Sequence, residues 1–240
     1  MKRAYLIEMT VLKDYMRQLI PLGFFVAFCI SLGMQSIVAA PAVITMLKFM
    51  MGSMAAAAYD EQNNWGLFRL TMPVTRRDVV LARYAVILTI GCTGMAIGLL
   101  AAAVLTGVAS AVKLPGGLSS ILAFDPGTVL GMLFASFFCM FMGSAVASVI
   151  TPVYFRFGQT KAAQYLPMMT VLIFIIPMLI IGSGVLDDAA VSMETLAELL
   201  KLIETPAGTA ACMAVFAAAS LVVLGISAAV SLRIYARREL

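Results

Sequence analysis

Long apolar stretches alternate with short polar segments along the chain. Five of these stretches are long enough to cross a bilayer, and none contains an Asp or Glu. The first, residues 19–58, is about twice as long as one membrane helix, which takes about 20 residues. Because proline disfavours helix in the residue before it, this stretch is best divided just before Pro41. The pattern therefore predicts six transmembrane helices, at about residues 19–38, 41–58, 84–107, 128–150, 165–186 and 208–232.

Composition supports an all-α, polytopic membrane protein. Of the 240 residues, 62% are apolar, and the mean hydropathy is +1.03, whereas a soluble domain is about 45–50% apolar. Six spans occupy about half of such a chain, so we expect a single membrane domain over residues 1–240. The four cysteines lie in apolar stretches without a C-x-x-C pair, and histidine is absent. We therefore expect no metal and no cofactor in this chain.

The basic residues predict how the chain is oriented in the membrane. Lysine and arginine are enriched in cytoplasmic loops, and six spans would place 13 of the 16 basic residues on one side. The overall charge of +4 is thus a sign of topology and indicates no nucleic-acid partner. We expect a multi-pass protein with both termini cytoplasmic. The basic residues on that side are Lys2, Arg3, Lys13, Arg17, Arg69, Arg76, Arg77, Arg83, Arg156, Lys161, Arg233, Arg237 and Arg238.

Two segments outside the spans are predicted to be amphipathic helices. In residues 1–18 an apolar face is formed at helical spacing by Tyr5, Leu6, Met9, Leu12 and Met16. A basic amphipathic segment before a span suits the lipid headgroup layer. This helix either anchors the first span alone or also touches a cytoplasmic partner. Residues 187–206 are expected to lie on the outer surface.

The segment 59–83 is the longest predicted internal loop, and it contains the only tryptophan. Thr75 has the spacing of a helix N-cap, with Asp78 three residues later, so a helix is expected to run from there into the third span. Two helical pieces exceed what a connector needs, which favours a docking role over a polar loop with an interfacial tryptophan. The candidate docking residues are Asp60, Glu61, Trp65, Phe68, Arg69, Leu70, Pro73, Arg76, Arg77 and Asp78.

Lys48 is the only charged residue inside a predicted span. A charge at the bilayer centre costs about 2.5–3.5 kcal/mol on insertion scales. Lys48 is therefore a candidate for lining a substrate path or meeting another subunit. The alternative is that its ammonium extends toward water and matters only for placing the helix.

Small residues four positions apart mark two predicted helix contacts. Gly94 and Gly98 form one such pair, and Gly143 and Ala147 form another. Pairs of this kind let membrane helices approach closely.

The sequence shows neither an ATP-binding motif nor the intramembrane carboxylates that usually couple transport to an ion gradient. It lacks the glycine-rich phosphate loop of an ATPase, since the run Gly158–Lys161 has no earlier glycine and its lysine follows a threonine. Proton- or cation-driven transporters usually carry carboxylates within the membrane, and an intramembrane enzyme needs convergent polar groups. Secondary transport and channel activity are therefore disfavoured, while a membrane assembly or immunity protein without transport stays open.

The segment from Asp60 to Trp65, with the runs Leu70–Asp78 and Arg83–Tyr84, resembles permease subunits of ABC-2 type transporters, especially the short bacterial ones similar to exporters of antimicrobial peptides. There an acidic-Asn-Trp segment precedes a Leu-x-Leu-Pro-[IV]-[ST]-Arg run. Leu70 and Pro73 match that run, while Met72 replaces its second leucine. The run Tyr154–Gly158 also resembles a segment between the fourth and fifth spans.

This resemblance implies a type V exporter-like permease with an N-terminal elbow helix and a cytoplasmic coupling helix. It also implies a second permease copy and two separate ABC ATPase subunits, which would hold the ATP and magnesium. The segment 59–83 would couple ATP-driven closure to the membrane helices. A bacterial cytoplasmic membrane and the export of peptides, amphipathic toxins, or lipid-like or drug molecules follow from the same resemblance.

Overall fold

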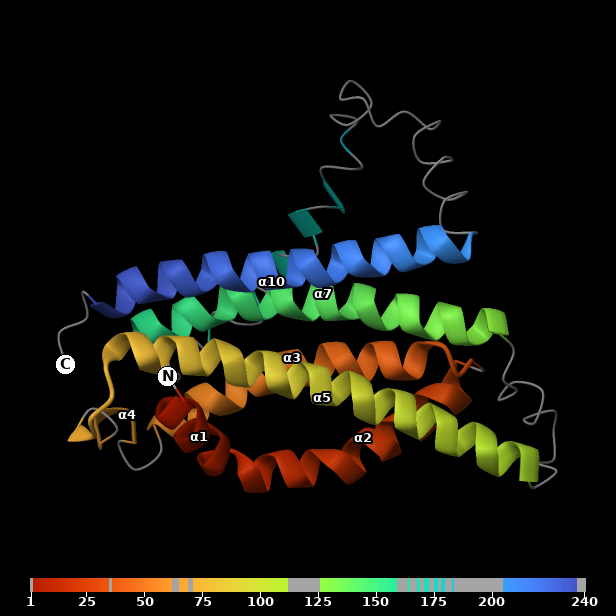
Figure 1. The fold of residues 1–240 in the computed structure, drawn as a ribbon, viewed down its shortest axis with the longest axis horizontal. Coiled ribbons are helices and arrows are strands. Elements are labelled where there is room, and N and C mark those ends of the chain that lie inside the picture. The colour runs from red at the N-terminus through yellow and green to blue at the C-terminus, as the bar shows by residue number, and fades with distance from the viewer. Residues whose placement is uncertain are drawn as a thin grey trace.

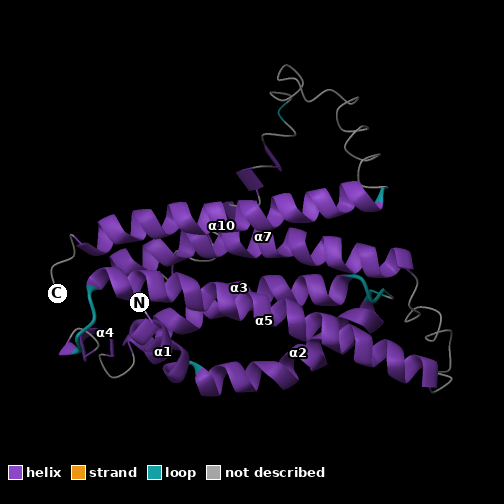
Figure 2. Cartoon of the chain, viewed as in Figure 1, coloured by secondary structure: helices purple, strands orange, loops and turns teal. Residues whose placement is uncertain are grey.

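The computed structural model describes residues 2–34, 36–61, 65–68, 71–111, 126–158 and 205–236, with isolated positions between 164 and 183. These residues form helices joined by short turns, and no strand occurs among them (Figure 2). The helices are α1 (Lys2–Val11), α2 (Lys13–Gly33), α3 (Ala39–Glu61), α4 (Trp65–Phe68), α5 (Arg76–Ala111), α7 (Pro126–Phe157) and α10 (Pro206–Ala236).

Five of the described helices, α2, α3, α5, α7 and α10, are long and apolar enough to cross a membrane. They lie side by side as a bundle (Figure 1). The end of the bundle where α4 lies, called the α4 end, is also where α1 begins and α10 ends. The predicted all-α membrane fold is confirmed by these helices.

The predicted fifth span, residues 165–186, and the amphipathic segment 187–206 fall almost entirely outside the described residues. In Figure 1, α7 ends at the α4 end, and α10 starts at the opposite end.

The predicted boundaries of the first hairpin were wrong. The first span was placed at 19–38, but α2 runs from Lys13 to Gly33, and the break falls at residues 34–38 instead of just before Pro41. Pro41 lies in the first turn of α3, where a missing backbone N–H removes no intrahelical hydrogen bond. The proline therefore begins the second helix instead of ending the first.

The N-terminal segment is likewise divided differently from the prediction. Instead of one helix over residues 1–18, α1 ends at Val11 and α2 begins at Lys13. The turn is at Leu12, which is fully buried against a cluster from α3 and α5 that includes Ala56 and Val86. Packing of this side chain fixes the junction between the surface helix and the first span.

The fourth membrane helix extends beyond its predicted end at residue 150. The segment 151–164 was interpreted as a loop, yet α7 continues through Phe157. It ends at Gly158, whose φ of 77° suits glycine at a helix C-terminus. The Gly158 N–H donates to the Tyr154 carbonyl (3.0 Å), which closes the last turn.

Helix α3 lies at the centre of the bundle, and glycines allow its neighbours to approach it. A Cβ added at Gly91 of α5 would lie 2.1 Å from the Phe49 ring, and one added at Gly98 would lie 2.7 Å from Pro41 Cα. On α7, a Cβ at Gly143 would lie 2.9 Å from Phe49. The predicted close approach is confirmed at Gly94, Gly98 and Gly143, where an added Cβ would lie within 3.0 Å of α3.

Candidate coupling site

The residues predicted to dock a partner gather at the α4 end of the bundle. Here α1, the last turn of α3, α4 and the first turns of α5 meet the last turns of α7 and α10 (Figure 1). The α3, α4 and α5 parts follow one another in the sequence, but α1, α7 and α10 are far from them, so the whole site exists only in the folded chain. Its core is a set of contacts that centre on α5.

Helix α4 supplies the exposed aromatic part of the site. The Trp65 and Phe68 rings have centroids 5.6 Å apart with an interplanar angle of 37°. Phe68 is 55% exposed, although large apolar side chains are usually buried. Arg69 and Leu70, which were also predicted to belong to this site, lie outside the described residues.

The start of α5 has the predicted N-cap. The Asp78 backbone N–H donates to Thr75 Oγ1 (3.1 Å), and the Thr75 hydroxyl donates to Asp78 Oδ2 (2.8 Å). Pro73 is exposed in the turn just before this cap. The cap fixes where α5 begins and thereby positions Arg76 and Arg77, both of which are exposed.

One buried arginine joins four helices at the α4 end. Arg83 Nη2 of α5 donates to Glu8 Oε1 of α1 (3.2 Å) and to Asp60 Oδ2 of α3 (2.7 Å). Its guanidinium carbon also lies 5.9 Å from the centroid of the Phe155 ring of α7, within the range of a cation–π contact. Arg83 is 3% exposed and Glu8 is 4% exposed, so this ion network is shielded from solvent.

A second arginine connects α5 to the end of the chain. Arg76 Nη1 donates to the backbone carbonyl of Tyr235 (3.2 Å), and its guanidinium carbon lies 5.8 Å from the centroid of the Tyr235 ring. A cation here compensates the partial negative charge at the C-terminus of α10. Tyr235 in turn packs on Phe155, with ring centroids 5.2 Å apart.

Polar contacts continue this connection into the bundle. The Tyr84 hydroxyl lies within hydrogen-bond distance of Ser227 Oγ (2.6 Å) and Ser231 Oγ (2.8 Å) on α10. The Ser227 hydroxyl donates to the Ser148 carbonyl of α7. Helices α5, α7 and α10 are therefore linked beyond their apolar packing.

The structure thus shows which predicted docking residues bond to other helices and which are exposed. Asp60 and Arg76 bond to other helices of the chain, and Arg76 is also exposed, as are Glu61, Phe68 and Arg77. Glu8 and Arg83 were not predicted as site residues. The sequence spacing held a signal for Glu8, because Glu8 is four residues from both Ala4 and Leu12 and so shares a helix face with these apolar residues. The structure buries all three.

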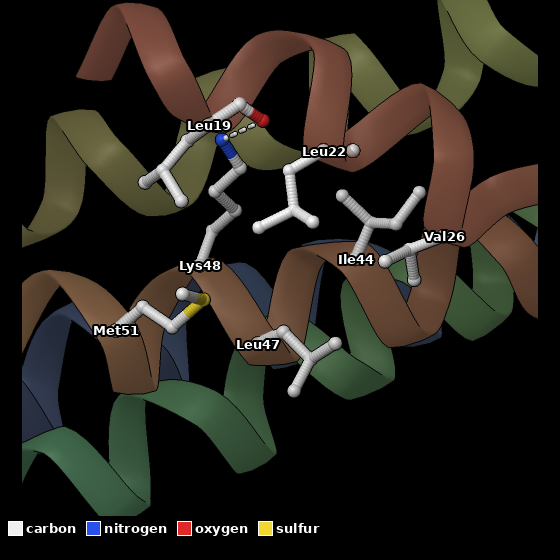
Figure 3. Close-up of a pocket in the computed structure, with 8 residues that line it drawn as sticks. Leu19, Leu22, Val26, Ile44, Leu47, Lys48 and Met51 are labelled. Atoms are coloured by element: carbon white, nitrogen blue, oxygen red, sulfur yellow. Dashed lines mark hydrogen bonds between the residues drawn. The ribbon is translucent and has the colours of Figure 1, made fainter. Parts of the chain in front are cut away.

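Lys48 lies apart from this end, in a groove between α2 and α3 (Figure 3). It is 3% exposed, and its ammonium donates to the Leu19 carbonyl of α2 (3.0 Å). A Cβ added at Gly94 would lie 2.6 Å from Lys48 Cβ, so the lysine stem packs on the α5 backbone. A role for Lys48 in a substrate path stays a prediction.

No metal site is formed by the residues that the structure describes. No group of three or more His, Cys, Asp or Glu side chains occurs among them in a position to hold an ion. The four cysteines are free thiols and lie on four different helices, α2, α5, α7 and α10.

The bundle of long apolar helices, with a short helix between two of them at one end, defines the class of a polytopic membrane protein. Comparison of the sequence with protein families gives a match over residues 6–236 to the family described as ABC-2 family transporter protein, and the chain belongs to this family. It is a membrane permease subunit of an ABC transporter, and membership implies association with an ABC ATPase subunit. A search of curated proteins found no match.

Proposed function

We propose that this chain is the permease of a bacterial exporter driven by a separate ATPase. Two permease chains, identical or homologous, would assemble with two ATPase subunits that hold ATP and magnesium. The cargo class is amphipathic: peptides, toxins, or lipid-like or drug molecules. The observation that carries the proposal is the exposed Phe68 of α4, at the same end of the bundle as the buried Arg83 network.

In this proposal the α4 end faces the cytoplasm, where the ATPases are. Helix α4 connects α3 to α5, and Arg83 connects those two helices to α1 and α7. Arg76 adds α10 through its contact with Tyr235. A push on α4 would therefore reach every described helix that contributes to this end. Such rigid-body movement is how a cavity between two permeases can switch its opening from one side to the other.

Removing the α4 aromatics is expected to weaken the complex with the ATPase. Phe68→Ala and Trp65→Ala each delete a large apolar side chain of the kind that dominates docking energy. The ATPase is expected to copurify about tenfold less, or to hydrolyse ATP without export, because hot-spot truncations cost about 2 kcal/mol or more. Copurification and export are measured on membranes containing equal amounts of permease.

Phe25→Ala is the matched control. Phe25 is 64% exposed but lies on α2, within a membrane-spanning helix and away from α4. This variant is expected to bind and couple the ATPase as the unchanged chain does. Unaltered copurification and unaltered coupling in both the Phe68→Ala and the Trp65→Ala variants would show that α4 is not the docking surface.

The proposed orientation is tested by cysteine labelling in a chain whose four native cysteines are replaced by alanine. Arg77→Cys is expected to react with a membrane-impermeant maleimide only after the membrane is opened, since Arg77 is exposed at the α4 end. Lys113→Cys and Lys201→Cys are expected to react in intact cells, because the six-span prediction places both outside. Labelling of Arg77→Cys from the outside would overturn the orientation.

A further inference from the structure

The groove at Lys48 holds a buried cation that lacks a counterion. The described structure gives the ammonium one hydrogen bond, to the Leu19 carbonyl, whereas a lysine ammonium has three donors. No ion pair involves Lys48 in this part of the chain. From Leu19 to Gly33 α2 contains no Asp or Glu, and α3 contains none before Asp60.

The ammonium lies near the boundary between the polar and the apolar parts of α2. Four polar residues, Lys13, Asp14, Arg17 and Gln18, occur before Leu19, and no charged residue follows it up to Gly33. The exposed Arg17 precedes Leu19 by two residues, or about 3 Å along the helix axis. Long cationic side chains at this position extend toward the lipid headgroups. The Lys48 ammonium therefore lies at about the depth of the headgroup region, and contact with a headgroup requires it to turn outward from its place beside the Leu19 carbonyl.

The rest of the groove is apolar and leads deeper into the bundle. Figure 3 shows Leu22 and Val26 of α2 facing Ile44 and Leu47 of α3, beyond the lysine. Val26 follows Leu19 by seven residues, or about 10 Å of helix. Leu22 and Leu47 are 44% and 39% exposed, so the rim of the groove is open to the surrounding membrane.

A cation at the boundary, beside a shallow apolar groove along α2 and α3, matches one kind of molecule. Its charged group is an acid located at headgroup depth, and its chain is a hydrocarbon that points toward the membrane centre. We propose that the groove between α2 and α3 binds one anionic phospholipid from the leaflet at the α4 end, with its acidic headgroup on Lys48. This inference depends on neither the direction of transport nor the ATPase.

The binding of lipid to the purified chain tests the proposal. Native mass spectrometry compares phosphatidylglycerol with phosphatidylcholine of the same acyl chains. The unchanged chain is expected to bind one phosphatidylglycerol about ten- to a hundredfold more tightly than phosphatidylcholine, the factor expected for one charge-assisted hydrogen bond. In Lys48→Met, which keeps the apolar stem, this preference is expected to disappear.

Two further variants distinguish lipid binding in the groove from the general effect of losing a positive charge. Lys13→Met removes an exposed cation from the start of the same helix and is expected to keep the preference. Leu47→Trp is designed to fill the rim of the groove while keeping Lys48, and it is expected to lower binding of phosphatidylglycerol. Thermal unfolding of each variant in phosphatidylcholine shows whether it is folded. If either Lys48→Met or Leu47→Trp is not folded, the other one is compared with the unchanged chain.

Two results would overturn the inference. One is an equal affinity of the unchanged chain for the two lipids, or an undiminished preference in Lys48→Met. The other is a change in the oligomeric state of Lys48→Met while its lipid preference stays intact, because Lys48 would then meet a second copy instead of a lipid.

Discussion

Arg83→Met is expected to destabilise the chain more than any other single exchange at the α4 end. The substitution leaves Glu8 buried at 4% exposure without the guanidinium that compensates its charge. It also removes the partner of Asp60, whose side chain is 24% exposed. Breaking a buried ion pair by removing one member costs about 3–5 kcal/mol. Chemical unfolding in detergent, followed by circular dichroism, measures the change in the free energy of unfolding.

Two comparison variants isolate the ion network as the cause. Arg77→Met removes an exposed arginine six residues earlier on the same helix and is expected to change the stability by no more than about 0.5 kcal/mol. The triple variant Glu8→Gln, Asp60→Asn, Arg83→Met removes all three charges and is expected to regain much of the loss, because no charge stays buried alone. Equal stability of Arg83→Met and Arg77→Met would contradict the assigned role.

Gly91→Ala is expected to be nearly as damaging, for a purely steric reason. The new methyl group would lie 2.1 Å from the ring of Phe49 on α3. Phe49 is fully buried, so its ring would have to shift within the packed core. Overpacking of this kind costs about 1–3 kcal/mol and occasionally more. The loss is measured as a lower free energy of unfolding together with less folded protein in the membrane.

The same helix provides the control. Gly107 is also in α5, but a Cβ added there meets nothing within 4 Å. Gly107→Ala is therefore expected to be neutral or to stabilise the helix, since alanine has a higher helix propensity than glycine by about 1 kcal/mol. Adding Phe49→Leu to Gly91→Ala is expected to restore part of the lost stability. Similar losses in Gly91→Ala and Gly107→Ala would mean that the contact with Phe49 is not what matters.

The membrane class and much of the topology could be predicted because they depend on local composition. Apolar stretches without acids define membrane helices, and the Thr75 cap is a pattern over four residues. Helix ends were less well predicted because the hydropathy of the sequence shows where the apolar, lipid-facing stretch ends. The helix itself can continue beyond that point into water. Helix α7 thus runs to Phe157, seven residues beyond its apolar stretch.

The centre of the α4 end could not be predicted, because its contacts join residues far apart in sequence. Arg83 pairs with Glu8 across 75 positions and with Asp60 across 23. Each of these residues, taken alone, is an ordinary charge in a polar segment. In the same way, Lys48 was recognisable as a charge within a span, but its carbonyl partner on α2 depends on how two helices pack.

The contact between Glu8 and Arg83 also sets an order of events during synthesis. A ribosome adds roughly 5–20 residues per second, so Arg83 follows Glu8 by about 4–15 s, given the 75 positions between them. Throughout that interval the carboxylate cannot make its contact with Arg83. Helix α1 can therefore settle into its final place only after the third membrane helix has emerged. The first helix to be made is, in this respect, one of the later ones to dock.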